Sequence, residues 1–244
     1  MDGTVVVTGG SRGIGAAVVQ ALAARGIATC FSYSTNREAA EAVARQAQEF
    51  GTAVLPVQAD VSDEADVRRL FTTAEKLGPV SGLVNNAGIN GPQSRVVDLD
   101  AARIRRLLEV NVLGAFLCAA EAVRRMNAAN GGTIVNVSSR AAVLGSAGEY
   151  VDYAASKAAV DTLTVGLAHE VARDGIRVVG VRPGLIRTDI HASAGDPGRV
   201  ERLQGSVPMG RGGEPGEVAE VIVWLLSDAA SYVTGTTLDV SGGR

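Results

Sequence analysis

The chain has 244 residues, of which 46% are hydrophobic and 20% charged, and its formal net charge is −3. This length suits one large α/β domain, and the absence of a basic cluster argues against nucleic acid as a partner. No apolar run approaches the ~20 residues that a membrane span requires, and two cysteines with two histidines are too few for a His/Cys metal cluster. We therefore expect a cytoplasmic protein with no membrane partner and no metal site.

Apolar, β-rich runs alternate with longer stretches of helical period along the whole chain. Strand-like runs occur at 4–8, 27–33, 53–58, 80–85, 132–137, 176–181 and 236–240. Helical stretches occur at 13–25, 36–50, 63–77, 100–128, 152–173 and 214–227. Alternation at this spacing predicts a single α/β domain over residues 1–244, a doubly wound parallel sheet of about seven strands with helices on both faces.

The segment from 184 to 212 differs from the rest, since it contains several Gly and Pro residues and little periodicity. Long irregular loops in compact domains are usually lids or binding loops. We therefore predict a flexible substrate loop at about 185–212. His191 lies in this loop, either as a solvent-exposed histidine or as a substrate contact.

A glycine-rich turn follows the first strand-like run and leads into the first helix, as Thr8-Gly9-Gly10-Ser11-Arg12-Gly13-Ile14-Gly15. Glycines let the backbone turn sharply and approach a pyrophosphate, and a helix N-terminus offers free N–H groups. This context predicts a Rossmann-type dinucleotide site. Its candidate contacts are Gly9, Ser11, Arg12, Gly13, Ile14 and Gly15. Two alternatives are a tight turn without a ligand and the nucleophile elbow of a hydrolase, in which Ser11 would be the nucleophile.

The end of the second strand bears on which dinucleotide is bound. An acid there would bond the adenosine ribose and repel a 2′-phosphate, but this chain has no acid between Phe31 and Glu38. Ser32 is expected at the strand end, with Arg12 and Arg37 as nearby cations. The pattern favours NADP(H) over NAD(H).

Polar residues recur where later strands end, and the carboxyl ends of parallel strands meet at one edge of a sheet. These residues are Asp60-Val61, Asn85-Asn86-Ala87-Gly88, Ser138-Ser139 and Arg182-Pro183-Gly184. Each is an ordinary turn sequence by itself. Together they predict one ligand crevice.

Tyr153 and Lys157 lie four residues apart, so a helix places both side chains on one face. A phenol has an ordinary pKa of about 10, and a neighbouring ammonium would lower it toward that of a useful proton donor. Lys157 is one of only two lysines among 23 basic residues, the other being Lys76. A solvated helix face is the alternative, which the motifs at the strand ends disfavour.

The order and spacing of these motifs resemble the short-chain dehydrogenase/reductase family over essentially the whole chain. The resemblance implies that Tyr153 is the general acid/base, that Lys157 holds the nicotinamide ribose and lowers the Tyr153 pKa, and that Ser139 bonds the reacting oxygen. It implies that Asn111 anchors a water that relays protons. The implied cofactor contacts are Asp60 and Val61 at the adenine, Asn86, Ala87 and Gly88 on the adenosine side, Pro183 and Gly184, and Ile186 and Thr188 at the carboxamide.

Two neighbouring serines compete for the catalytic role. Ser139 is preferred to Ser138 because its distance from Tyr153 is closer to the spacing usual in the family. Successive side chains on a strand point to opposite faces, so only one of the two can serve.

The resemblance implies an NAD(P)-dependent oxidoreductase that moves a hydride between nicotinamide and a carbonyl or secondary alcohol. Ketoacyl-thioester reductases and glucose or polyol dehydrogenases look most similar, and substrate choice would lie in 90–95, 140–150 and 185–212. The alternative is a catalytically silent nucleotide-binding scaffold or sensor of the same fold.

Apolar residues in the helices at 100–128 and 152–173 exceed what one sheet face can bury, and relatives pair such helices, so we expect a homotetramer, a dimer of dimers.

Overall fold

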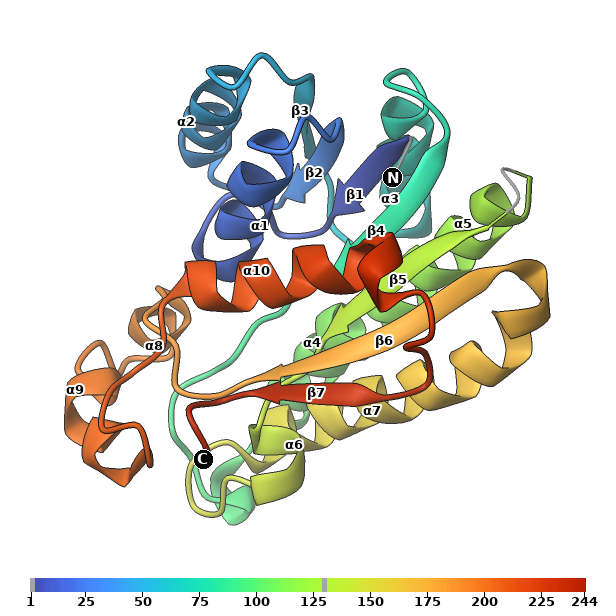
Figure 1. Cartoon of the computed structure of the whole chain (residues 1–244). Coiled ribbons are helices and arrows are strands. Elements are labelled where there is room, and N and C mark those ends of the chain that lie inside the picture. The colour runs from blue at the N-terminus through green and yellow to red at the C-terminus, as the bar shows by residue number, and fades with distance from the viewer. Residues whose placement is uncertain (1–2, 129–130) are drawn as a thin grey trace.

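The computed structural model describes residues 3–128 and 131–244 and contains one parallel sheet in the order β3-β2-β1-β4-β5-β6-β7 (Figure 1). Its strands are β1 (Thr4–Val7), β2 (Thr29–Tyr33), β3 (Val54–Gln58), β4 (Val80–Asn85), β5 (Gly132–Val137), β6 (Ile176–Pro183) and β7 (Thr237–Val240). The order reverses at β1, which pairs with both β2 and β4. Such a reversal opens a crevice at the carboxyl ends of the strands.

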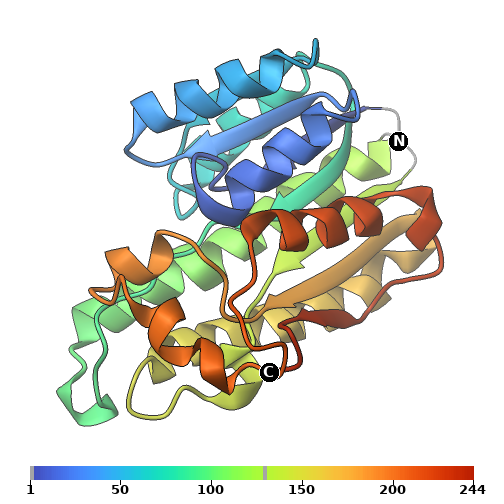
Figure 2. The same ribbon diagram turned by 60° about the vertical axis from the view of Figure 1, so that its left-hand side comes forward.

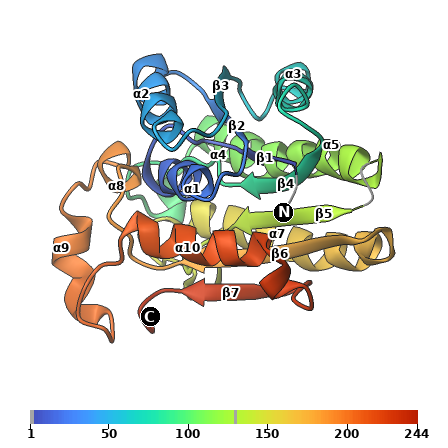
Figure 3. The ribbon, with the colours of Figure 1, turned by 45° about the horizontal axis from the view of Figure 1, so that its top comes forward.

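Helices cover both faces of the sheet, with α10 in front of it and α7 behind in Figure 3. One face carries α1 (Gly13–Ala23), α2 (Arg37–Gln48) and α10 (Pro215–Leu226). The other carries α3 (Glu64–Ala74), α5 (Gly114–Ala128) and α7 (Val151–Val171). The seven strands and two helical layers confirm the predicted doubly wound fold.

Strand β1 shows why the sheet is buried on both sides. Val5 and Val7 pack in the core beneath α1 and α10, whereas Val6 packs in the core beneath α3 and α5. Alternate residues of a strand point to opposite faces, so a strand covered on both sides needs apolar residues throughout. The continuous valine run is therefore a consequence of the parallel architecture.

The predicted helix at 100–128 is divided in three: α4 (Ala101–Leu108), the π-helical turn η2 (Glu109–Leu113) and α5. Within η2, Asn111 is buried. Its side-chain amide forms hydrogen bonds with the Ile89 backbone and with Ser156, both outside its own helix. A Cβ at Gly114 would come 2.7 Å from the Cγ2 atom of Val61, so the start of α5 approaches that loop very closely. A π-turn contains one more residue than an α-helical turn but keeps the helical direction. The hydrophobic periodicity of the sequence alone could therefore not reveal it.

The segment after β6 is more ordered than the irregular loop that its composition predicts. It contains α8 (Ile190–Ser193), α9 (Arg199–Leu203) and the turn η4 (Gln204–Ser206). Further short helices are α6 (Ala141–Leu144), η1 (Val96–Asp98), η3 (Ala172–Asp174) and η5 (Asp228–Ala230). All are three to five residues long, too short for a periodic signal.

We call residues 184–212 the flap. In Figure 2 the flap, in orange, lies at the same end of the molecule as the green connection after β4 and the yellow-green connection before α7. That end holds the carboxyl edges of the strands, so the flap borders the crevice.

Across residues 3–128 and 131–244, no helix combines the length and apolarity needed to cross a membrane.

Candidate active site

A crevice of about 1020 Å³ runs along the carboxyl ends of the strands. Its walls come from the glycine turn, the ends of β2 to β6, the N-terminal half of α7 and the flap. Every predicted site residue lines it except Gly15 and Asn111, which lie directly behind its walls. The volume is at the upper end of those of ligand pockets.

The glycine turn has the geometry of a phosphate cradle. Gly9 and Gly13 have φ values of +67° and +55°, which residues with a Cβ rarely adopt. The Asn86 amide fixes the turn by donating to the carbonyl oxygens of Thr8 (2.8 Å) and Gly9 (3.0 Å). A Cβ at Gly15 would collide with the Gly9 carbonyl.

The N-terminus of α1 opens toward this turn. Among the described residues no side chain caps it, and its first turn contains no acid. Its N–H groups and positive dipole end therefore remain for an anion. These residues fit the pyrophosphate of a dinucleotide.

Ser32 does not occupy the position expected for it. It is buried in β2, and its Oγ accepts a hydrogen bond from the Gly9 backbone N–H (3.1 Å), so it braces the glycine turn. Ser34 and Thr35, just beyond the strand end, are the exposed hydroxyls in the crevice wall. The difference arises because the strand ends one residue later than Ser32.

The two cations expected near the phosphate also differ in position. Arg12 lies in the crevice wall and donates from Nη1 to the Ser193 hydroxyl in α8 (3.1 Å). Arg37 instead pairs with Glu41 on the exposed surface of α2 (2.7 Å). Arg37 is therefore no part of the crevice wall, whereas Arg12 is.

In another part of the crevice wall, Asp60 and Val61 follow β3 as predicted. The Asp60 carboxylate accepts hydrogen bonds from Ser62 Oγ (2.6 Å) and Arg106 Nη2 (2.8 Å). These bonds hold the loop after β3 against α4 and fix the shape of this part of the wall.

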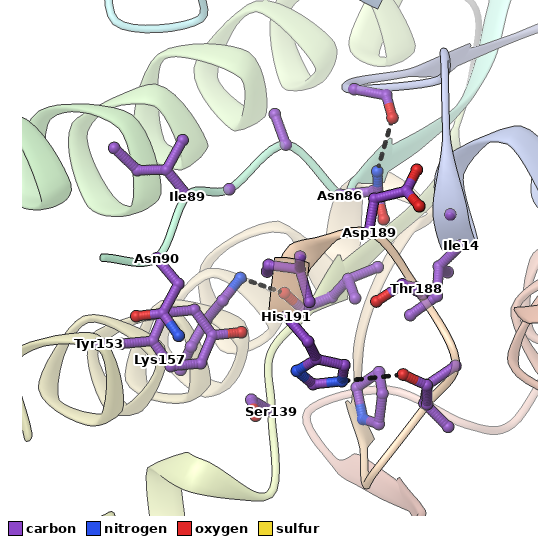
Figure 4. Close-up of a pocket in the computed structure, with 18 of the residues that line it drawn as sticks. Ile14, Asn86, Ile89, Asn90, Ser139, Tyr153, Lys157, Thr188, Asp189 and His191 are labelled. Carbon is purple, nitrogen blue, oxygen red and sulfur yellow. Dashed lines mark hydrogen bonds between the residues drawn. The ribbon is translucent and has the colours of Figure 1, made fainter. Parts of the chain in front are cut away.

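The catalytic candidates meet at one end of the crevice (Figure 4). Tyr153 and Lys157 project from α7, with Asn90 and Ser139 beside them. The Lys157 ammonium lies 5.7 Å from the centre of the Tyr153 ring and donates to the Val137 carbonyl oxygen (2.8 Å). That bond ties the lysine to the end of β5.

The two serines after β5 have different surroundings. Ser138 is buried and donates to the backbone carbonyl of Lys157 (3.0 Å), so it joins β5 to α7. Ser139 lies in the crevice wall, where its Oγ accepts from the Ala141 N–H (3.1 Å). Ser139 is thus the serine beside Tyr153.

Burial is the largest influence on the pKa values of Tyr153 and Lys157. It raises the pKa of Tyr153 to about 12, although the Ser139 hydroxyl acts to lower it. Burial lowers the pKa of Lys157 to about 8, with the Asp161 charge acting to raise it. The expected lowering of the Tyr153 pKa by Lys157 is therefore not present in the protein by itself, because removing both groups from water outweighs the attraction between them.

Asn111 supports the site from behind. Its Oδ1 accepts from the Ile89 N–H (2.8 Å), and its Nδ2 donates to the Ile89 carbonyl (2.9 Å) and to Ser156 Oγ (3.1 Å). A Cβ at Gly88 would lie 3.3 Å from both Asn111 Oδ1 and Lys157 Nζ. Asn111 thus holds the strand exit against α7.

The start of the flap forms the remaining wall. Pro183, Gly184, Ile186 and Thr188 line the crevice, and a Cβ at Gly184 would come 2.6 Å from Ser241 Cα. His191 is half-buried and not an exposed loop residue, since its Nε2 lies 2.9 Å from the Ile186 carbonyl oxygen. It faces the catalytic end in Figure 4.

Buried ion pairs around the site escaped the sequence interpretation. Arg103 pairs with Asp152 next to Tyr153, and Arg182 pairs with Asp161 beyond Lys157. Arg199 of the flap pairs with Glu149 (2.5 Å) and stacks on the Tyr150 ring. The partners are 21 to 50 residues apart, so no local pattern could indicate them.

Comparison with known proteins places this site in a family. The profile described as Enoyl-(Acyl carrier protein) reductase matches residues 9–244. Similar solved structures include chains described as short-chain dehydrogenase/reductase. The chain belongs to the short-chain dehydrogenase/reductase family.

Individual members of the family are similar over nearly their full length. The uncharacterized oxidoreductase YgfF of Escherichia coli (strain K12) is 54% identical, with 98% of each chain covered. Cis-4-hydroxycyclohexanecarboxylate dehydrogenase of Sinomonas cyclohexanicum is 42% identical over 98% of this chain and 94% of its own. The 3-ketoacyl-(acyl-carrier-protein) reductase of Brucella melitensis, solved with NADH, has a TM-score of 0.92 and 32% identity over 100% and 98% of the two chains.

The protein is therefore a nicotinamide-dependent oxidoreductase of this family that acts on CH–OH or C=O groups. Membership of an oxidoreductase family argues against the hydrolase interpretation of the glycine turn.

Proposed function

We propose that the protein is an NADP(H)-dependent dehydrogenase/reductase that uses Tyr153 as the general acid/base on a small carbonyl or secondary alcohol substrate. The observation that carries this is the meeting of Tyr153, Lys157 and Ser139 at one end of a crevice whose other end is a phosphate cradle. A site of this kind fits proton transfer to an oxygen next to a bound nicotinamide.

In the reductive direction, Tyr153 donates its phenolic proton to the carbonyl oxygen as that oxygen gains negative charge. Ser139 donates a hydrogen bond to the same oxygen and stabilises the charge. Lys157 holds the ribose and stabilises the phenolate that Tyr153 becomes. Bound nicotinamide supplies the hydride, and accepts it in the reverse direction.

Preference for NADP(H) is supported by the end of β2. Ser34 and Thr35 offer hydroxyl groups, and Arg12 lies in the same wall. The first acid after the strand, Glu38, lies in the first turn of α2 and outside the crevice wall. Hydroxyl and guanidinium donors favour a 2′-phosphate, whereas an acid would repel it.

The substrate pocket lies between Asn90, the 140–150 segment and the flap. Ketoacyl thioesters, sugars and polyols remain the proposed classes. Cyclic hydroxy acids join them because the 42% identical relative is named for one.

We also propose a homotetramer built as a dimer of dimers. Leu108, Leu113, Phe116 and Val165 are large apolar residues left exposed on α4, η2, α5 and α7. Large apolar residues exposed on neighbouring helices favour association.

Incubation of the pure protein with NADPH or NADH and a panel of these carbonyl compounds tests the activity. We expect NADPH consumption with at least one class. Tight NADPH binding without turnover across the whole panel would instead favour the silent scaffold.

A further inference from the structure

Beneath the catalytic end of the crevice, four charged side chains form a continuous chain of ion pairs. Asp161 in α7 accepts from Nε of Arg182 in β6 (2.8 Å). Nη1 of Arg182 lies 3.6 Å from Oδ1 of Asp239 in β7, and Oδ2 of Asp239 accepts from Nη1 of Arg140 (2.6 Å). The chain thus connects α7, β6, β7 and the residue that follows Ser139.

Asp161 lies one helical turn beyond Lys157, which places the two residues on the same face of α7. Its side chain is only 14% exposed. Arg182 binds Oδ2, whereas Oδ1 is buried and has no hydrogen-bond partner among the described residues. A buried carboxylate oxygen without a donor is costly unless a nearby cation compensates it. The neighbouring ammonium along the helix belongs to Lys157.

We propose that Asp161 is a positioning residue that keeps the buried ammonium of Lys157 charged, and that the Arg182 guanidinium competes with Lys157 for the Asp161 charge. The interaction is electrostatic and acts at a distance, since the hydrogen bond of the Lys157 ammonium goes to the Val137 carbonyl. It deepens the proposed function, because a charged Lys157 is what stabilises the Tyr153 phenolate.

Several charged or titratable groups lie on the elements packed around Lys157: Tyr153 and Asp161 on α7, Arg140 after β5, Arg182 on β6, Asp239 on β7, His191 in α8, and the Arg103–Asp152 pair between α4 and α7. Of these, Asp161 supplies the charge that opposes the loss of the ammonium, while burial lowers the Lys157 pKa to about 8. A pKa that low is close to neutrality, so a modest change in Asp161 would leave a large fraction of the lysine uncharged.

The chain offers a direct test because it contains only two lysines, Lys76 and Lys157. Protein grown with ¹³C-labelled lysine gives two side-chain NMR signals, which Lys76→Arg assigns. Titration of the cofactor-free protein then measures the Lys157 pKa without any turnover. If the proposed enzymatic activity is wrong, this measurement of the Lys157 pKa therefore still tests the role of Asp161.

Asp161→Asn keeps an oxygen for Arg182 but removes the charge, so the Lys157 pKa should fall by about one pH unit. Arg182→Gln should raise it, because Asp161 loses its competing cation. Asp239→Asn breaks the outer link and should change the Lys157 pKa much less. In all three variants the Lys76 signal should titrate as in the wild type.

The opposite signs separate charge from structure, since mere opening of the site would move Lys157 toward an ordinary lysine pKa in every variant. An unchanged or raised Lys157 pKa in folded Asp161→Asn would overturn the proposal. If that variant does not fold, a lowered or unchanged pKa in Arg182→Gln overturns it.

Discussion

Arg103 donates two hydrogen bonds to the carboxylate of Asp152, the residue before Tyr153: Nε to Oδ2 at 2.8 Å and Nη2 to Oδ1 at 3.3 Å. The same guanidinium donates to the Pro92 carbonyl (2.7 Å), so it joins the loop after β4 to the first turn of α7. A Cβ at Gly91 would lie 2.9 Å from the guanidinium carbon, so a side chain there would displace the Arg103 guanidinium. Tyr153 is thus anchored from a helix that is distant in sequence.

This pair should matter for both stability and turnover. The Asp152 side chain is only 3% exposed, and Asp152→Asn would leave the Arg103 charge without its partner. We expect a loss of about 3 kcal/mol in the free energy of unfolding and a lower kcat. Urea denaturation measures the first quantity. A double-mutant cycle with Arg103→Gln is the control, and additive effects of the two changes would contradict the coupling.

Tyr153→Phe removes the phenolic proton and little else. We expect kcat to fall by at least ~10²-fold, the usual size of a general-acid contribution, while NADPH still binds. Lys157→Arg should also be strongly impaired, because a planar guanidinium does not replace a compact ammonium. Steady-state kinetics and fluorescence titration of NADPH measure the two effects. The fully exposed Tyr232 supplies the control, Tyr232→Phe, and equal activity of both variants would sink the mechanism.

The cofactor preference should respond to Ser34. Ser34→Asp places a carboxylate where a 2′-phosphate would lie, so KM for NADPH should rise and use of NADH should improve, with little change in kcat. Ser32→Ala is the matched control, since loss of its bond to Gly9 should weaken both cofactors alike. Arg12→Ala should weaken NADPH alone. A wild type that prefers NADH, with an unchanged ratio in Ser34→Asp, would show that the assignment is wrong.

Lys157 should reduce the stability of the cofactor-free protein. Its pKa is about 8 in the fold and about 10.4 in an unfolded chain, so at pH 7 folding must bury an ammonium. Lys157→Met should therefore stabilise the protein by up to about 3 kcal/mol at pH 7. The gain should shrink as pH rises from about 8 toward 10, because the wild-type lysine becomes neutral. Thermal unfolding at both pH values measures this, and Lys76→Met, at an exposed position, should show no such dependence.

The proposed tetramer can be tested at Phe116, which is 49% exposed on α5. Phe116→Glu places a charge in the apolar surface and should reduce the particle mass measured by light scattering. Phe50→Glu changes a phenylalanine that is 57% exposed beyond the end of α2 and should leave the assembly intact. A monomeric wild type at micromolar concentration would refute the tetramer.

Local chemistry in the sequence was enough to predict much of this protein. The valine runs and helical stretches predicted all seven strands within two residues at either end, because a sheet covered on both faces requires continuous apolar strands. Gly9 and Gly13 indicated the phosphate turn, and the Tyr153–Lys157 spacing placed both side chains at one end of the crevice, since four residues make one helical turn.

Only the tertiary structure decided how those parts act on one another. In the folded chain the Ser32 hydroxyl accepts a hydrogen bond from Gly9, and Ser34 lies in the crevice wall. Burial in the fold raises the Tyr153 pKa. The tertiary structure also brought Arg103 to Asp152 across 49 residues of sequence. Side-chain direction at a strand end, desolvation and long-range ion pairs depend on what the rest of the chain packs against a residue. Helical and strand periodicity carry no information about those partners.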